Sequence, residues 1–312
     1  MKKVLISDAT HEVLPRRLRE AGFEVNVVPG LDYAGLLQAV QGCEGLVVRS
    51  KVAIDRAFID AAPSLRCIGR VGAGMETIDT DYATRRGIRC LNSPEGNRDA
   101  VGEHAVGLLL ALLDRIAVAD REVRQGLWRR EANRGRELGS LTVGIIGLGN
   151  MGQAFARRLS GFGCRVVAYD KYKPQGEAVA GVERVSLAEL QAVADVVSFH
   201  VPLTAETHHY LCADFVHHMQ KPFYVVNTAR GAVVDTEALV KAMQSGQVLG
   251  AALDVLEYEE MQADGLGRGS EALDYLRQSE QAVLTPHVAG WTVESKYRLA
   301  AVLADKMVEA LR

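Results

Sequence analysis

Four side chains in the second half of the sequence have the chemistry of an acid–base and anion-binding site. Arg230 follows the apolar run in VVNTARG, Asp254 ends the run in VLGAALDV, and His287 follows the run in AVLTPH. Glu259 comes shortly after Asp254, in DVLEYEE. Histidine exchanges a proton near neutral pH, a carboxylate stabilises its charged form, and the planar fork of arginine binds carboxylates.

Each of these residues also has an ordinary interpretation. Arg230 could be a solvated surface charge, Asp254 a helix cap, and Glu259 part of a solvated acidic loop. His287 is one of eight histidines. What favours a shared site is position, because ligands of open α/β sheets bind beyond the carboxyl ends of the strands.

The stretch GIIGLGNMG is a candidate dinucleotide-binding turn. Gly147, Gly149 and Gly152 fit the pattern G-x-G-x-x-G between a strand-like run, TVGII, and a helix-like run, MGQAFARRL. In this motif the first glycine allows a tight turn, the second lets the backbone approach a pyrophosphate, and the third lets helix and strand pack closely. Amides at the start of the helix, where Asn150 and Met151 lie, would face the phosphates.

Asp170 bears on which dinucleotide is bound. It ends VVAYD, the next strand-like run after the glycine turn. A carboxylate at this place binds the ribose 2′-hydroxyl and repels a 2′-phosphate, which favours NAD over NADP. Lys171, the next residue, weakens that exclusion slightly.

The motifs GIIGLGNMG, NTARGAVVD, LGAALDV and TPHVAG occur in this order. On these motifs the chain resembles the D-isomer-specific 2-hydroxyacid dehydrogenases almost from end to end. The resemblance implies that Arg230, Glu259 and His287 are the catalytic residues. It also implies that Asp254 contacts the nicotinamide side of NAD, with Thr228 and His287 as further cofactor contacts.

The implied roles agree with the chemistry of the side chains. NAD carries the hydride between a 2-hydroxy acid and its 2-oxo acid. His287 is the general acid and base, and Glu259 stabilises its imidazolium form. Arg230 binds the substrate carboxylate and polarises the adjacent carbonyl.

The first hundred residues supply the candidate substrate contacts. VVRSK and IGRVGAG place arginines and glycines after strand-like runs, and NSPEGN places an asparagine near a helix start. Amides of the VGAG turn could hold a carboxylate, and the arginines a second anionic group, although a surface salt bridge is the alternative for each arginine. The candidates are Arg49, Ser50, Arg70, Gly72, Ala73, Gly74 and Asn97.

Within the family, these segments are most similar to members that oxidise 3-phosphoglycerate to 3-phosphohydroxypyruvate, which opens serine biosynthesis. Two departures bear on that expectation. Glu76 and Thr77 stand where such members typically have aspartate and asparagine, and Glu259-Glu260 is followed by a longer segment, EMQADGLGRGSEALDYLRQ counted from Glu260, that lacks the expected proline. A glyoxylate or hydroxypyruvate reductase is therefore an alternative, and an NAD(H)-sensing corepressor-like binding protein is another.

The elements that must position these residues follow an alternating pattern. Strand-like runs and helix-like segments succeed one another in both halves, which is typical of parallel sheets covered by helices. A long helix is expected over residues 98–125 and an amphipathic helix over residues 292–311, with a loop in GLWRREANRGREL.

The late position of the glycine turn predicts the domain organisation. We expect an α/β protein with two doubly wound parallel-sheet domains, in which a Rossmann NAD-binding domain, 98–290, is inserted into a flavodoxin-like substrate domain, 1–97 plus 291–312. The crossings near Asn97 and Gly290 would then act as a hinge. We also expect a homodimer through the cofactor domain, and a short form without the regulatory domain that some relatives append.

Composition excludes several classes of protein. The 312 residues carry a net charge of −3, with 48% hydrophobic and 24% charged residues, so nothing indicates nucleic-acid or membrane-surface binding. The five cysteines are scattered without a CxxC pair, which argues against a disulfide framework or a metal site. The longest apolar run, AVGLLLALL, is far too short to span a membrane. A cytoplasmic protein is expected.

Overall fold

The computed structural model describes the whole chain except residues 50, 174–178, 261–264 and 267–269. The described residues form two compact units. Unit 1 contains Met1–Arg98 and Trp291–Arg312, and unit 2 contains Asp99–Glu260 and Gly265–Gly290.

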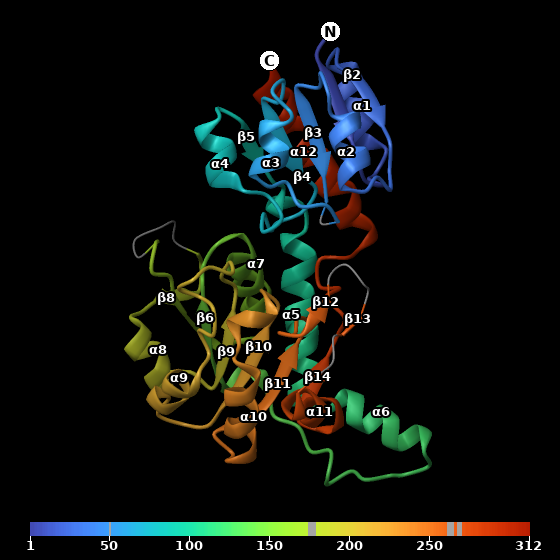
Figure 1. Ribbon diagram of the computed structural model, residues 1–312. Helices are drawn as coiled ribbons and strands as arrows, with labels where there is room; N and C mark the ends of the chain where they lie inside the picture. The colour runs from blue at the N-terminus through green and yellow to red at the C-terminus, as the bar shows by residue number, and fades with distance from the viewer. Residues whose placement is uncertain (50, 174–178, 261–264, 267–269) are drawn as a thin grey trace. The chain divides into compact units, whose positions relative to one another are not determined.

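Unit 1 is built on a parallel sheet with the strand order β2-β1-β3-β4-β5. This is the flavodoxin-like order expected from the sequence. Both chain termini lie in this unit (Figure 1). Its strands are β1 (Lys3–Ile6), β2 (Glu24–Val27), β3 (Gly45–Val48), β4 (Cys67–Arg70) and β5 (Arg89–Leu91).

Helices cover both faces of this sheet because successive strand residues point to opposite sides. Val4 and Ile6 of β1 pack with α1 (Val13–Glu20) and α12 (Val293–Leu311), and Leu5 packs on the other face. That other face is covered by α2 (Tyr33–Ala39), α3 (Arg56–Asp60) and α4 (Thr80–Arg85). A short 3₁₀ helix, η1 (Pro94–Gly96), follows β5.

Unit 2 is built on a larger parallel sheet with the order β14-β11-β10-β9-β6-β7-β8. The strand order reverses between β6 and β9, which is the switch point where doubly wound sheets bind nucleotides. The strands are β6 (Thr142–Ile146), β7 (Arg165–Tyr169), β8 (Val182–Arg184), β9 (Val196–Phe199), β10 (Phe223–Asn227), β11 (Val248–Leu253) and β14 (Ala282–Leu284). The predicted fold class, with a Rossmann unit and a flavodoxin-like unit, is confirmed.

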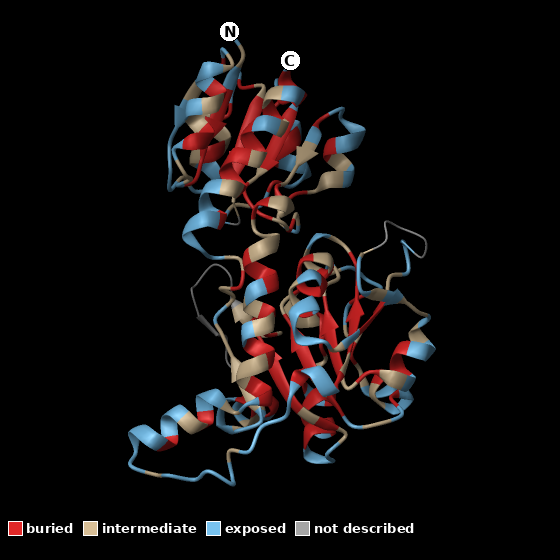
Figure 2. Cartoon of the chain, turned by 180° about the vertical axis from the view of Figure 1, so that it is seen from behind, coloured by how far each residue is buried: buried red, intermediate tan, exposed pale blue. Residues whose placement is uncertain are grey.

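Two hydrophobic layers enclose the sheet of unit 2, and its strands are largely buried (Figure 2). One layer contains α5 (Arg98–Leu113) and α7 (Asn150–Leu159). The other contains α8 (Leu187–Val193), α9 (Ala213–His218), α10 (Thr236–Gln244) and α11 (Glu271–Gln278). Three 3₁₀ helices connect elements here: η2 (Leu138–Ser140), η3 (Ser160–Phe162) and η4 (Gly231–Val233).

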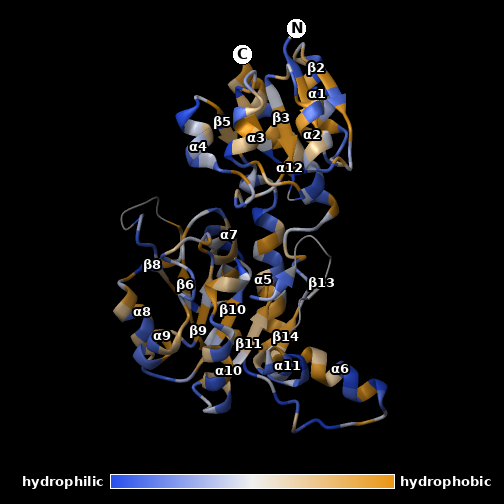
Figure 3. Ribbon diagram, in the orientation of Figure 1, coloured by the Kyte–Doolittle hydropathy of each residue, from blue (hydrophilic) through white to orange (hydrophobic). Residues whose placement is uncertain are grey.

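The prediction of a single helix over residues 98–125 is wrong. The chain forms α5 and then a separate helix, α6 (Ile116–Arg124), because Arg115 between them has a left-handed backbone, φ 53°. A right-handed helix cannot continue through such a residue. Hydropathy changes at the same place: α5 carries many apolar residues, whereas α6 mixes apolar and charged residues (Figure 3).

A short antiparallel ribbon was not predicted. It pairs β12 (Glu259–Glu260) with β13 (Gly265–Leu266). Glu259 therefore lies on a paired strand rather than in the solvated loop that its acidic neighbours suggest.

Candidate active site

The candidate catalytic residues follow three neighbouring strands. Arg230 comes shortly after β10, Asp254 directly follows β11, and His287 follows β14. These strands are adjacent and parallel, so their carboxyl ends lie at one edge of the sheet (Figure 1). The fold thus brings these residues to the same edge of unit 2.

His287 and Glu259 form a close pair. The imidazole Nδ1 lies 2.7 Å from Glu259 Oε2, and Glu259 Oε1 accepts the amide of Leu256 at 2.6 Å. A carboxylate only accepts hydrogen bonds, so Nδ1 carries the proton and Nε2 is the nitrogen that can exchange one with a ligand. The His287 side chain is 37% exposed and that of Glu259 is 20% exposed, so the histidine is the more accessible partner.

The backbone of His287 is in the left-handed region, with φ 53°. A non-glycine residue in this region costs roughly 1–3 kcal/mol and persists only where the surroundings hold it. The His287 amide donates to the carbonyl of Asp254 at 2.7 Å and to that of Thr285 at 3.0 Å. The turn after β14 is therefore bonded to the end of β11.

Asp254 is the buried anchor of that turn, with 1% exposure. Its Oδ1 accepts the Thr285 hydroxyl at 2.6 Å and the Val288 amide at 2.9 Å, and its Oδ2 accepts the Ala289 amide at 2.9 Å. His104 Nε2 lies 3.4 Å from Oδ1. Burial alone would raise the pKa of this carboxyl, but the hydrogen bonds together outweigh burial and lower the pKa.

Arg230 lies in a turn that packs against the segment carrying Glu259. Its Nη1 donates to the Ala229 carbonyl at 2.7 Å, and its own carbonyl accepts the buried Asn227 side chain at 2.9 Å. A Cβ on Gly231 would overlap the carbonyl of Leu256. Only glycine allows the two segments to approach so closely.

Glu257 holds the same segment from the other side, a role that the sequence did not reveal. Its Oε1 lies 2.5 Å from His209 Nε2, and its Oε2 accepts the Thr236 hydroxyl at 2.8 Å and the Thr236 amide at 3.2 Å. The run EYEE reads as a solvated acidic loop, whereas Glu257 and Glu259 are both partly buried and paired. No local signal marks this role of Glu257, because its partners His209 and Thr236 lie far away along the chain.

The glycine turn between β6 and α7 has the shape expected for a pyrophosphate. Gly147 has φ 90°, and a Cβ on Gly152 would overlap the Gly147 carbonyl oxygen, so the turn itself requires both glycines. A Cβ on Gly149 would meet nothing within 4 Å. The open space lies beside the N-terminus of α7, where Asn150 and Met151 form the first turn.

Asp170 lies beside this turn, at the end of β7. Its Oδ2 accepts the Leu148 amide at 2.8 Å, and its Oδ1 accepts the amides of Tyr172 and Lys173 at 3.0 Å each. The neighbouring Lys171 ammonium lies 2.6 Å from a Glu206 carboxylate oxygen. Three backbone amides thus hold the carboxylate of Asp170 beside the glycine turn.

Comparison with known proteins agrees with this geometry. The family model described as "D-isomer specific 2-hydroxyacid dehydrogenase, NAD binding domain" matches residues 106–289. The chain belongs to this family. The matched range carries the glycine turn together with Arg230, Glu259 and His287, so the predicted family and the predicted NAD cofactor are confirmed.

Individual relatives extend the dehydrogenase family match to nearly the whole chain. A curated D-3-phosphoglycerate dehydrogenase of Archaeoglobus fulgidus is 37% identical over 98% of this chain and 56% of its own length. This chain thus spans little more than half the length of the curated relatives it matches. A solved protein of Thermus thermophilus is 35% identical, with TM-score 0.83 and coverage of 99% of this chain and 96% of its own. A D-lactate dehydrogenase of Aquifex aeolicus, solved with NAD and lactic acid, is 28% identical, with TM-score 0.81 and coverage of 99% and 94%.

Unit 2 has unsatisfied polar atoms at two strand ends beside the switch point of its sheet. Among the described residues, His200 Nδ1 and Thr228 Oγ1 are buried and have no hydrogen-bond partner. They follow β9, which neighbours β6 in the sheet, and β10, which neighbours β9. A ligand with polar groups would satisfy them. Sequence reasoning proposed Thr228 and missed His200, although His200 also stands at a strand end.

His200 is neutral at any physiological pH. Burial lowers the pKa of its imidazole to about 3, and its Nε2 lies 2.8 Å from the Ser198 hydroxyl. Its carbonyl oxygen would lie 2.6 Å from a Cβ on Gly147, so the end of β9 packs directly on the glycine turn. These observations fit a bound dinucleotide at the switch point.

In unit 1, Arg49 follows β3 and is fixed at two points. Its amide donates to Asp8 Oδ2 at 2.9 Å, and its guanidinium lies 5.2 Å from the ring centre of Trp291. The indole is 69% exposed, so it supports one face of the arginine without enclosing it. Ser50, the adjacent candidate, lies outside the described residues.

The VGAG turn of unit 1 is partly occupied by its own neighbours. The Gly72 amide donates to the Ser93 hydroxyl at 3.3 Å, and the Ala73 carbonyl accepts the Asn92 side chain at 2.6 Å. The Arg70 side chain fills the place where a Cβ on Gly72 would stand. Any carboxylate bound here would depend on the later amides, Ala73 and Gly74, more than on Gly72.

Asn97, the last substrate candidate in unit 1, directly follows η1. Its Oδ1 is buried and lacks a hydrogen-bond partner among the described residues. An acceptor in this state suits a ligand that donates a hydrogen bond, such as a hydroxyl group.

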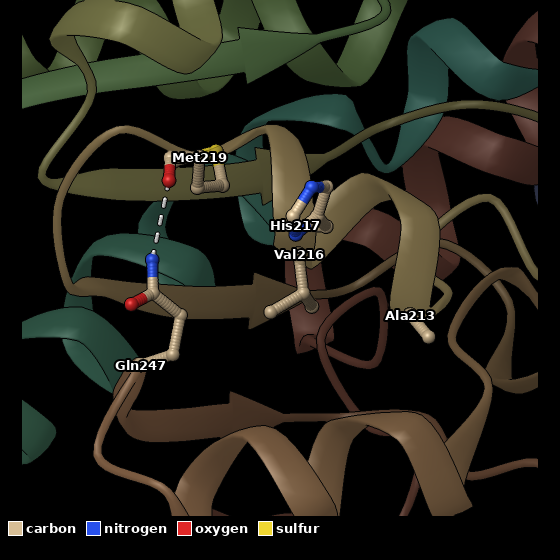
Figure 4. A pocket seen from close by; sticks show the side chains of 5 residues that line it. All are labelled: Ala213, Val216, His217, Met219 and Gln247. Carbon is tan, nitrogen blue, oxygen red and sulfur yellow. Dashed lines mark hydrogen bonds between the residues drawn. The ribbon is translucent and has the colours of Figure 1, made fainter.

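A surface hollow of about 360 Å³ lies elsewhere in unit 2 (Figure 4). It is lined by Ala213, Val216, His217, Met219 and Gln247, and Gln247 immediately precedes β11. It therefore lies at the amino end of that strand, at the opposite edge of the sheet from the candidate catalytic residues, and it is not the active-site candidate.

The described part of the chain lacks two further kinds of feature. There, no helix is long and apolar enough to cross a membrane. No group of three or more histidine, cysteine or acidic side chains in those residues is placed to hold a metal ion.

Proposed function

We propose that this protein is an NAD-dependent oxidoreductase that interconverts a D-2-hydroxy acid and its 2-oxo acid. The observation that carries the proposal is the His287–Glu259 pair, which lies at the same sheet edge as Arg230 in an NAD-binding domain. Unit 2 would bind the cofactor and unit 1 the distal part of the substrate.

The proposed roles are supported by the chemistry of the side chains and, for Glu259 and His287, by their hydrogen bond. Arg230 binds the substrate carboxylate, and its charge polarises the adjacent C2 oxygen. His287 Nε2 takes the hydroxyl proton during oxidation and returns it during reduction. Glu259, bonded to Nδ1, stabilises the imidazolium and holds the ring. Bound NAD accepts the hydride from C2 or returns it.

The substrate that we favour is 3-phosphoglycerate, oxidised to 3-phosphohydroxypyruvate in serine biosynthesis. The name of the Archaeoglobus relative supports this choice, as do the arginines of unit 1, Arg49 and Arg70. A glyoxylate or hydroxypyruvate reductase is the second candidate, because Glu76 and Thr77 depart from the pattern of phosphoglycerate enzymes.

The decisive test of the catalytic assignment is His287→Ala. We expect turnover to fall to background while the Kd for NADH stays nearly unchanged, because the imidazole exchanges the proton and the glycine turn holds most of the cofactor. The matched control is His218→Ala, which removes an exposed histidine on α9. Full activity of His287→Ala would overturn the assignment.

Substrate choice needs a separate measurement, the oxidation of NADH with phosphohydroxypyruvate, hydroxypyruvate, glyoxylate and pyruvate. We expect the highest kcat/KM with phosphohydroxypyruvate, and we expect Arg49→Ala to reduce that value far more than the value for glyoxylate. Equal losses would remove the phosphate-binding role of Arg49. No turnover with any of the acids, together with tight NADH binding, would favour an NAD(H)-sensing binding protein.

Three finer proposals accompany the function. NAD is preferred to NADP because Asp170 is fixed beside the glycine turn. A homodimer would use α6 and the loop after it, where Ile116, Val123 and Trp128 are exposed. A reducing, cytoplasmic location agrees with five free cysteines.

A further inference from the structure

His104 is a histidine of unit 2 that the proposed reaction does not use directly. It lies on α5, and its Nε2 is 3.0 Å from the Thr285 hydroxyl and 3.4 Å from Asp254 Oδ1. It therefore joins a helix on one face of the sheet to the ends of β11 and β14. Its side chain is 26% exposed, whereas that of Asp254 is 1% exposed, so His104 forms the outer end of the network.

Each hydrogen bond in this network has a defined donor and acceptor. Thr285 has a single hydroxyl proton, and the short 2.6 Å contact to Asp254 Oδ1 uses it. The hydroxyl oxygen can then only accept from His104, so Nε2 of His104 carries a proton. The order of donation is His104 to Thr285 to Asp254.

The carboxylate at the end of this chain holds the turn of the catalytic histidine. Asp254 accepts the amides of Val288 and Ala289 through its side chain and the amide of His287 through its carbonyl. These bonds offset the strain of the left-handed backbone at His287. If the Asp254 side chain turned, two of the three bonds would be lost.

We propose that His104 is a positioning residue for His287. By donating to Thr285 and lying beside Asp254, it keeps the carboxylate in the one orientation that serves the turn, and thereby keeps the His287 ring aligned with Glu259. This inference rests on the proposed function, in which His287 exchanges the proton.

The test compares two variants of the whole protein. His104→Phe keeps a flat ring but removes the donor, and His104→Gln keeps an N–H donor on a side chain of similar reach. We expect His104→Phe to reduce kcat about tenfold or more, since small misplacements of a catalytic group are costly, with KM for NADH nearly unchanged. His104→Gln should recover most of the lost kcat.

A purely structural role would give another pattern. Equal loss in both variants, or a loss in His104→Phe that follows a lowered melting temperature, would overturn the proposal. So would wild-type kcat in His104→Phe. His217→Phe, at an exposed histidine on α9, is the matched control and should leave kcat unchanged.

A second measurement does not depend on turnover. Long-range ¹H–¹⁵N NMR spectra report which ring nitrogen of His287 carries the proton. We expect the Nδ1–H form in the wild type and a mixture of forms in His104→Phe. An unchanged His287 signal in His104→Phe would overturn the positioning role, even if the protein turned over no substrate. A wild-type protein that is inactive on all of the acids would contradict only the proposed function.

Discussion

Glu259 binds His287 with one carboxylate oxygen and its own chain with the other: Oε2 lies 2.7 Å from His287 Nδ1, and Oε1 accepts the Leu256 amide at 2.6 Å. The carboxylate cannot rotate without losing one of the two bonds. The ring of His287 is thus oriented by a group that is itself held in place.

We expect Glu259→Gln to lower kcat about a hundredfold, within the usual range for acid–base catalysis, and to change KM for the 2-oxo acid little. The neutral amide cannot stabilise the imidazolium, and its NH₂ group would face a donor. Steady-state kinetics at pH 7 measure the effect. Glu280→Gln, at an exposed carboxylate that pairs with Arg115 and Arg121, is the control, and an equal loss in both variants would contradict the role of Glu259.

The glycine turn allows a matched pair of substitutions. Gly149→Ala should fold normally, because its φ is −79° and its Cβ has free space, yet weaken NADH binding by filling the place of the pyrophosphate. Gly152→Ala should lower the free energy of unfolding by roughly 1–3 kcal/mol, because its Cβ would overlap the Gly147 carbonyl oxygen. Urea unfolding and NADH fluorescence titration distinguish the two. Unchanged NADH affinity in Gly149→Ala would argue against a pyrophosphate at this turn.

Glu206 bears on the choice between NAD and NADP. The hydrogen bond between Glu206 and Lys171 raises the pKa of Lys171 and lowers the pKa of Glu206. Both groups are therefore charged and paired. Glu206→Gln should release Lys171 to attract a 2′-phosphate and raise the ratio of kcat/KM for NADPH to that for NADH about two- to fivefold, the range of a surface ion pair. Asp170→Ala should raise the ratio further. If the ratio stayed at its wild-type value in both variants, residues other than Asp170 and Glu206 would determine the cofactor preference.

The lowered pKa of Asp254 predicts that the stability of the folded protein depends on pH. Its pKa is lowered in the folded protein, so its charged form stabilises the fold above the ordinary value near 3.8, and this contribution is lost as the pH falls through the folded pKa. Asp254→Asn should lower the free energy of unfolding by roughly 1–3 kcal/mol at pH 7, since a buried donor loses its acceptor. The difference between wild type and variant should stay constant down to about pH 5 and shrink below pH 4. A difference that grows in acid would contradict the charged state of Asp254.

Much of the fold was predictable because its signals are local. Apolar runs ended by polar residues marked most strands, and glycines such as Gly22 and Gly42, both with positive φ, marked helix ends. The break at Arg115 was not predictable, because ADREVR continues a helical pattern and an arginine rarely adopts a left-handed backbone.

The candidate site was predictable only in part. Arg230, Asp254 and His287 were visible because each follows a strand in a short motif. His104 was not visible, since it lies within an apolar helix far from its partners in sequence, and Glu257 was hidden in an acidic run.

The sequence by itself determined the family, the two-sheet architecture, the glycine turn and the types of candidate catalytic group, because alternating strands and helices and short motifs are encoded locally. Only the tertiary structure decided how those groups are held: that Glu259 is bonded on both oxygens, and that Asp254 is a buried anchor supported by His104. Hydrogen bonds between residues separated by many positions depend on how strands and helices pack, and no local pattern records that packing.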